Sequence, residues 1–351
     1  MANSKKYTGY IGTYTKGASK GIYSFVLDAA EGRITDVKPA AYLGNPTYLA
    51  ISKDNRFLYS VAKEDHLGGV SGYTIGEDGS LAFINSQLSP GAPPCHVCVN
   101  AENTLLLSAN YHKGSADSYL LNLETGGIDS VLSTIVHEGS GPDKRQEKAH
   151  SHYAGFTPDE NYVAVVDLGI DQLITYSLDN GQLVEQGSMQ VTPGSGPRHL
   201  AFHPNGSHAY LMTEFSSEVL VLKYNSEDGS FEQLQAITTI PAGFSENNQG
   251  SAIHISSDGR FIYAANRGHD SIATFKIDQE TFTLSFLAHT STEGNWPRDF
   301  VLDPSEKFLI ASNQNSSNLI LFARNQDTGE LTLLQSDIQV PDPVCVKFLH
   351  Y

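Results

Sequence analysis

The chain has 351 residues, of which 40% are hydrophobic, so it has enough apolar material for a large core and is not intrinsically disordered. Its 39 acidic residues outnumber its 22 lysines and arginines, and the net charge of −17 argues against a general nucleic-acid or anionic-membrane surface. Three cysteines exclude a disulfide scaffold, and 31 glycines with 15 prolines favour many turns over a mostly helical fold.

The N-terminal segment, residues 1–10, contains two lysines but no apolar stretch, so we expect no secretory signal peptide. No apolar run reaches the roughly 18 residues that a membrane span needs. We therefore expect a soluble cytoplasmic protein without a membrane partner. Cys95 and Cys98 form a C-x-x-C motif within an expected strand, where residues three apart point to opposite faces, so a shared zinc is not expected.

A strand–turn–strand pattern recurs along the chain, at residues 46–59, 94–107, 150–164, 197–210, 250–263 and 297–310. The aligned turn positions 54, 101, 159, 205, 258 and 305 lie 46 to 58 residues apart. Several of these turns contain Asp-Gly, Asn-Gly or Asp-Pro, which is typical of hairpins. A third apolar run follows each hairpin, at residues 72–75, 118–123, 173–178, 219–222, 272–277 and 319–322, and a shorter fourth run closes the unit.

Four short strands per repeat of this length are typical of a β-propeller blade. The C-terminal segment 343–349 matches the first strand of a blade, while segments 7–12, 21–26 and 37–43 match the second, third and fourth. One blade is therefore expected to combine both termini, which would remove the exposed edges of an open ring. The sequence predicts an all-β fold with a single domain over residues 1–351, a seven-bladed β-propeller with four antiparallel strands per blade.

Polar residues recur at matched positions of the blades. The column inside the first strand contains Tyr48, His96, His152, His199, Ala252, Asp299 and Cys345. The column before it contains Thr47, Cys95, Ser151, Arg198, Ser251, Arg298 and Val344. The column at the end of the second strand contains Lys63, Asn110, Leu168, Glu214, Arg267 and Gln314. Such a ring predicts a small-molecule site at the channel mouth, with a merely water-filled polar channel as the alternative.

Two insertions, at residues 136–149 and 241–250, are expected on the same face as these columns. The first places Lys144, Arg145 and Lys148 there, although a solvated loop would look the same. His150 and His152 are two residues apart and could chelate an ion, but no third ligand is evident, so no metal is predicted. The chain contains no G-x-S-x-G nucleophile elbow, no H-E-x-x-H motif and no phosphate-binding glycine loop.

Six segments together carry a resemblance to a known family: residues 145–152, 194–199, 213–217, 254–263, 266–271 and 297–300. They resemble the seven-bladed propeller lactonases, which include cycloisomerase-type 6-phosphogluconolactonases and fungal carboxy-muconate lactonising enzymes. The resemblance covers nearly the whole chain. The lactonising branch uses a histidine, two arginines and a glutamate, and the matching positions are His150 or His152, Arg198, Arg267 and Glu214. Phe215 stands where the family often has leucine.

The resemblance implies hydrolysis of 6-phosphogluconolactone, a step of the pentose phosphate pathway, with a small anionic sugar lactone as partner and no cofactor. This reaction needs a positioned water, a base and stabilisation of the oxyanion. Glu214, His150 and His152 are the candidates for the base. Arg198 and Arg267 are the candidates for binding the oxyanion and the phosphate. Further substrate contacts are expected from His96, Arg145, His199, His254 and Arg298.

Two other functions remain open at this point. The same residues suit lactonisation of a muconate-like diacid, and a propeller can instead be a protein-binding scaffold. The polar mouth columns favour a small anion over a protein partner. The Trp-Asp signature of scaffold repeats is also absent, because the single tryptophan, Trp296, precedes a proline.

Overall fold

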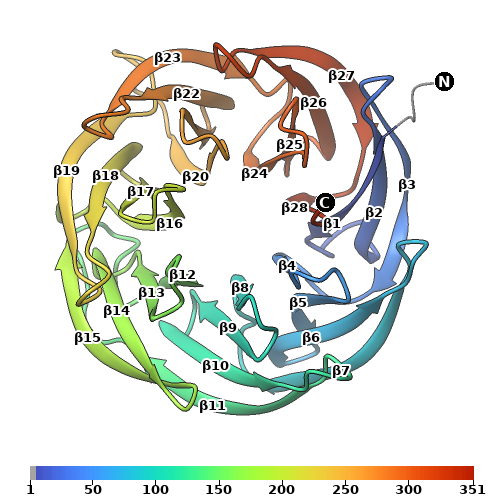
Figure 1. Cartoon of the computed structure of the whole chain (residues 1–351), viewed down its shortest axis with the longest axis vertical. Helices are drawn as coiled ribbons and strands as arrows, with labels where there is room; N and C mark the ends of the chain where they lie inside the picture. Colours follow the sequence, from blue (N-terminus) through green and yellow to red (C-terminus); the bar gives the residue numbers. More distant parts are fainter. Residues whose placement is uncertain (1–4) are drawn as a thin grey trace.

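Seven four-stranded antiparallel sheets form a ring around a central axis in the computed structural model, which describes residues 5–351 (Figure 1). The predicted all-β propeller is therefore confirmed. Residues 1–4, part of the segment considered for a signal peptide, lie outside the described residues. No helix in residues 5–351 is long and apolar enough to cross a membrane.

Six of the seven blades run from the axis outward in chain order. Blade 1 is β4 (Leu49–Ile51), β5 (Phe57–Glu64), β6 (Leu67–Ile75) and β7 (Leu81–Pro90). Blade 2 is β8 (His96–Val99), β9 (Leu105–Asn110), β10 (Ser115–Leu121) and β11 (Ile128–Val136). Blade 3 is β12 (Ser151–Phe156), β13 (Tyr162–Asp167), β14 (Gln172–Asp179) and β15 (Gln182–Gln190). Blade 4 is β16 (Pro197–Phe202), β17 (His208–Thr213), β18 (Glu218–Tyr224) and β19 (Phe231–Thr238).

The remaining blades follow the same plan. Blade 5 is β20 (Gln249–Ile255), β21 (Phe261–Arg267), β22 (Ser271–Ile277) and β23 (Leu284–Ser291). Blade 6 is β24 (Pro297–Leu302), β25 (Phe308–Asn313), β26 (Asn318–Arg324) and β27 (Leu331–Gln339). The closing blade has the order β28 (Pro343–Phe348), β1 (Lys6–Thr13), β2 (Gly21–Asp28) and β3 (Arg33–Tyr42).

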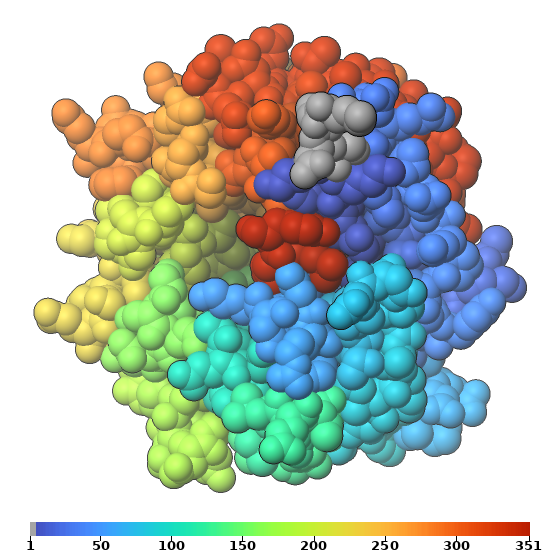
Figure 2. Space-filling view, turned by 45° about the vertical axis from the view of Figure 1, so that its right-hand side comes forward, coloured from blue at the N-terminus to red at the C-terminus, as the bar shows by residue number. Residues whose placement is uncertain are grey.

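The closing blade joins the two ends of the chain as predicted. The C-terminal strand β28 pairs antiparallel with β1, with Tyr10 opposite Lys347. The last residues continue onto the N-terminal half, where the Thr8 amide donates to Tyr351 Oη at 3.0 Å and the His350 amide donates to Asn55 Oδ1 at 2.8 Å. Figure 2 shows this C-terminal segment wedged between N-terminal residues. The ring is thus held shut by strand pairing and by the tail.

One strand is longer than the sequence indicated. The fourth strand of the closing blade begins at Arg33, four residues before the predicted start at Val37. The turn ends earlier than expected because Gly32 adopts the left-handed conformation, with φ 59°, directly before Arg33. Strand β3 is exposed along much of its length, so its hydrophobic pattern is weak at this point.

Apolar side chains fill the spaces between neighbouring blades. Tyr210 and Val221 of blade 4, for example, belong to one buried cluster with Ile262 and Phe275 of blade 5. Each sheet is therefore covered on both faces, which explains the continuous apolar runs of the middle strands. Because the inner strands turn polar side chains toward the axis, the propeller holds rigid polar groups at the ends of its central channel.

Candidate active site

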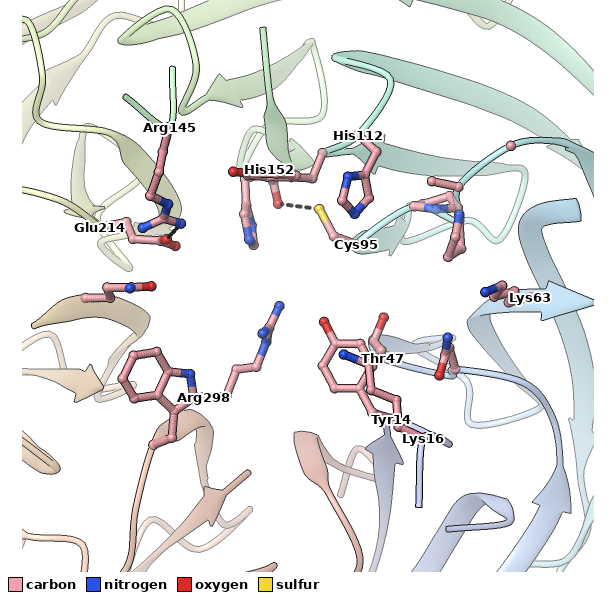
Figure 3. A pocket seen from close by; sticks show the side chains of 18 of the residues that line it. Tyr14, Lys16, Thr47, Lys63, Cys95, His112, Arg145, His152, Glu214 and Arg298 are labelled. Atoms are coloured by element: carbon pink, nitrogen blue, oxygen red, sulfur yellow. Dashed lines mark hydrogen bonds and ion pairs between the residues drawn. The ribbon is translucent and has the colours of Figure 1, made fainter. Parts of the chain in front are cut away.

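A cavity of about 670 Å³ opens at one end of the central channel. Its walls come from the loops between blades, from the loops that join the second and third strands of a blade, and from the adjoining strand ends, such as His152 of β12 and Arg298 of β24. The lining includes Tyr14, Lys16, Asn45, Thr47, Lys63, Asp65, His66, Cys95, Tyr111, His112, Arg145, His152, Glu214, Gln249, Arg267, Trp296 and Arg298. Many of these side chains point into the cavity in Figure 3.

A buried carboxylate, Glu214, is bound by three arginines in one wall. Glu214 follows the last residue of β17 and is only 2% exposed. Its Oε2 lies 2.7 Å from Arg267 Nη2 and 3.1 Å from Arg198 Nε. Arg145 of the first insertion donates to Oε1. Glu214 and Arg267, which occupy matched positions on adjacent blades, are therefore spatial neighbours, and Arg198 from the inner strand of blade 4 joins them.

Backbone groups fix two of these arginines. Arg198 Nη1 donates to the Ser251 carbonyl at 2.7 Å, and Arg267 Nη2 donates to the Gly250 carbonyl at 2.9 Å. A Cβ atom on Gly250 would lie 2.2 Å from the Thr213 carbonyl oxygen, so only glycine allows blades 4 and 5 to approach this closely. The guanidinium groups are therefore held in place before any substrate binds.

The third arginine is less enclosed. The side chain of Arg145 is 34% exposed, and its guanidinium lies over the Phe215 ring at 4.5 Å from the ring centroid. The Arg145 guanidinium thus makes a cation–π contact with the face of the Phe215 ring. Figure 3 shows Arg145 reaching Glu214 from the insertion.

The arginines decide the charge of this cluster. Burial favours the neutral acid, but Arg267, Arg198 and Arg145 outweigh that effect and hold the pKa of Glu214 well below its usual range. Burial, followed by repulsion from Arg267, lowers the pKa of Arg198 to about 9, so it remains a cation at neutral pH. One carboxylate thus faces three guanidinium groups, and this part of an acidic protein is positive.

His152 is the histidine of the predicted pair that lines the cavity. It lies on β12 and is 4% exposed. Burial, and then the nearby Arg198 charge, lower its pKa well below the usual value, so the ring is neutral at pH 7. Its Nδ1 has no hydrogen-bond partner in the described part of the chain. A neutral imidazole carries a lone pair that can accept a proton.

His150 is placed differently and does not line the cavity. Its ring stacks on Tyr111 with 4.1 Å between centroids, and its Nδ1 lies 2.8 Å from the Tyr111 carbonyl oxygen. Its amide donates to Asp167 Oδ1 at 2.7 Å. Within residues 5–351, no group of three or more His, Cys, Asp or Glu side chains is arranged to hold a metal ion.

Three other predicted substrate contacts are outside the cavity lining. The His96 and His199 rings pack against each other at 5.6 Å, and His199 lies 5.2 Å from His152. His254 Nε2 lies 3.7 Å from Asp299 Oδ1. His96 and His199 occupy the same matched column as His152, so the column alone did not indicate which of its side chains would line the cavity. Arg198 contacts Glu214 but is also outside the lining, whereas Arg145 and Arg298 line the cavity.

Several lining residues were not among the predicted site residues. Tyr111 and His112 directly follow β9, and Trp296 directly precedes β24. Arg267 lies over the Trp296 ring at 5.5 Å. The sequence could have identified these three residues by their position next to the polar columns, because loops that adjoin matched strand ends meet at the same end of the channel.

Comparisons with known proteins agree with this geometry. Residues 8–348 match the family model "Lactonase, 7-bladed beta-propeller". The chain is 55% identical over 346 residues to the 6-phosphogluconolactonase of Bacillus subtilis (strain 168), which covers 98% of this chain and 99% of that protein. It also resembles two solved structures. One is a Lactobacillus plantarum protein, with a TM-score of 0.95, 41% identity, and coverage of 99% of this chain and 100% of that chain. The other is the Pseudomonas aeruginosa periplasmic gluconolactonase, with a TM-score of 0.93, 31% identity, and coverage of 98% of this chain and 99% of that chain.

Proposed function

Because the chain belongs to the seven-bladed β-propeller lactonase family, we propose that it hydrolyses 6-phosphogluconolactone to 6-phosphogluconate. The observation that carries this proposal is the cationic cavity, in which arginines outnumber the one buried carboxylate in a chain of net charge −17. An anionic lactone would be drawn to such a site and excluded from the rest of the surface.

The reaction adds water across one ester bond. The water oxygen attacks the lactone carbonyl carbon while a base takes its proton, and the carbonyl oxygen becomes an oxyanion. The bond from that carbon to the ring oxygen then breaks, the ring oxygen takes a proton to become a hydroxyl, and the new carboxylic acid releases its proton to solvent. Arg267 and Arg298 line the cavity and are the donors we assign to the oxyanion.

His152 is the base we assign. Its low pKa keeps the imidazole neutral at physiological pH, and it lines the cavity where the water would lie. Glu214 is ionised, but its Oε1 is bound by Arg145 and its Oε2 by Arg198 and Arg267, so neither oxygen is free to take a proton from the water. We therefore assign to Glu214 the positioning of Arg145 and Arg267.

No covalent intermediate is needed. Cys95 is the thiol in the lining, and burial raises its pKa to about 11, so it stays protonated at neutral pH. Its Sγ lies 3.6 Å from the Ser151 carbonyl oxygen, to which it can donate. A protonated thiol is a weak nucleophile, and this supports direct attack by water.

The test is lactone hydrolysis, corrected for spontaneous ring opening, by the wild type and by His152→Gln and His150→Gln variants. Removing a general base lowers kcat by about 10²- to 10⁴-fold, and we expect this for His152→Gln alone. His150→Gln is the matched control, because that ring is buried beside Tyr111 outside the cavity lining. The base would be reassigned if His150→Gln abolished turnover while His152→Gln was silent.

A further inference from the structure

The cavity has a second cationic end, formed by Lys16 and Lys63. Figure 3 shows Lys63 across the cavity from Glu214 and Arg145, with Arg298 reaching in between. Both lysines are exposed cavity-lining residues. Neither ammonium makes a hydrogen bond or ion pair with any residue in 5–351; Lys16 only approaches the Tyr14 ring, at 4.7 Å. Asp65 is the carboxylate that lines this end.

The backbone that carries these lysines is fixed. Thr15 donates from its amide and its hydroxyl to Asn45 Oδ1, at 3.0 and 3.1 Å, and the Asn45 amide donates back to Thr15 Oγ1 at 3.1 Å. The Lys63 amide donates to the Gly44 carbonyl at 2.9 Å. The loop after β1, the loop before β4 and the end of β5 are therefore joined into one rim, and the backbone of both lysines is anchored in it.

Arg298 connects this rim to the reaction centre. Its guanidinium lies over the Tyr14 ring at 5.3 Å and 3.3 Å from Gln314 Oε1, without a carboxylate partner among the described residues. The guanidinium groups around Glu214 differ, because each already binds that carboxylate. The free positive charge of the cavity thus extends from Arg298 toward Lys16 and Lys63.

We propose that Lys16 and Lys63 form the subsite for the phosphate of the substrate, with the lactone ring beside Arg298. This inference rests on the proposed function. A phosphate monoester carries about −1.5 to −2 charges at pH 7, so it is best matched by cations that no protein carboxylate has neutralised. Arg198 and Arg267, which the sequence suggested for the oxyanion and the phosphate, share their charge with Glu214, so less of it is left to balance a phosphate. Two lysines at the opposite end would hold the phosphate while the carbonyl faces His152.

The test compares 6-phosphogluconolactone with its unphosphorylated analogue in a Lys16→Met/Lys63→Met double variant. Because each lysine would supply a charge-assisted hydrogen bond to the phosphate, each should contribute about tenfold to kcat/KM for the phosphorylated lactone. We expect the ratio of kcat/KM for the two lactones to fall by about 10²-fold, mainly through KM. A Lys20→Met/Lys38→Met variant removes the same charge from the closing blade outside the cavity and should leave the ratio unchanged.

A binding measurement keeps the inference separate from the proposed function. Inorganic phosphate, titrated by calorimetry, should bind the wild type and the Lys20→Met/Lys38→Met control, with clearly weaker binding to the cavity double variant. If the wild type hydrolysed neither lactone above the spontaneous rate, the proposed function would fail, yet this pattern of phosphate binding would still support the subsite. The subsite proposal would be overturned if the ratio of kcat/KM for the two lactones were the same in the cavity double variant as in the wild type. It would also be overturned if all three proteins bound phosphate equally.

Discussion

Replacing Glu214 with glutamine should destabilise the protein, because it removes the one negative charge that the three arginines share. Arg145 can turn to solvent, since its side chain is 34% exposed, but the side chains of Arg198 and Arg267 are only 3% and 5% exposed. They would remain as two buried, unneutralised cations. Removing one partner of a buried ion pair typically costs about 3–5 kcal/mol.

The expected shift in melting temperature follows from the size of the chain. An unfolding entropy of about 2.1 cal/mol/K per residue, over 351 residues, converts this loss into roughly 4–7 °C. Differential scanning calorimetry at neutral pH measures it. Glu218→Gln is the matched control, because Glu218 starts the next strand without an ion pair in the described structure. A surface change of this kind costs about 0.5 kcal/mol or less.

The pH dependence gives a second readout for the same variant. The folded-state pKa of Glu214 lies below its unfolded value of about 4.3, so the unfolded chain binds the proton first as the pH falls. The stabilisation is therefore complete above about pH 4.3 and declines below it. The stability gap between wild type and Glu214→Gln should narrow on acidification. A gap that stayed constant with pH, or that matched the Glu218→Gln control, would refute this account of the cluster.

Two further results are expected. The pKa of His152 is held well below the usual histidine value of about 6.5, so kcat/KM should stay level as the pH falls from about 8 to about 6. Stopped-flow assays measure this, and a decline of kcat/KM centred near about pH 6.5 would count against His152 as the base. Deleting the residues after Val340 removes β28 and unpairs the edge of β1, so light scattering should report aggregation; a soluble, cooperatively folded monomer would contradict the closure scheme.

The repeat made much of this site predictable. Once the blades were aligned, Glu214 and Arg267 had to lie side by side, because equivalent strand ends of adjacent blades meet at the channel mouth. The shared closing blade followed from unpaired strand patterns at both termini. In a closed ring, residues at equivalent positions of consecutive repeats are spatial neighbours, so the sequence repeat predicts which residues lie close together.

The sequence repeat carries no information about the insertions, which differ between blades, or about which side chains of a blade reach the cavity. Arg145 lies in an insertion, and only the folded loop places its guanidinium on Glu214. The resemblance left His150 and His152 as alternatives for one role, but in the folded chain the His150 ring stacks on Tyr111 while His152 lines the cavity. Their separate environments arise from strand register and side-chain direction, and the low pKa of Glu214 arises from three cations converging on one buried group. These are properties of distance and burial, which exist only once the chain has folded.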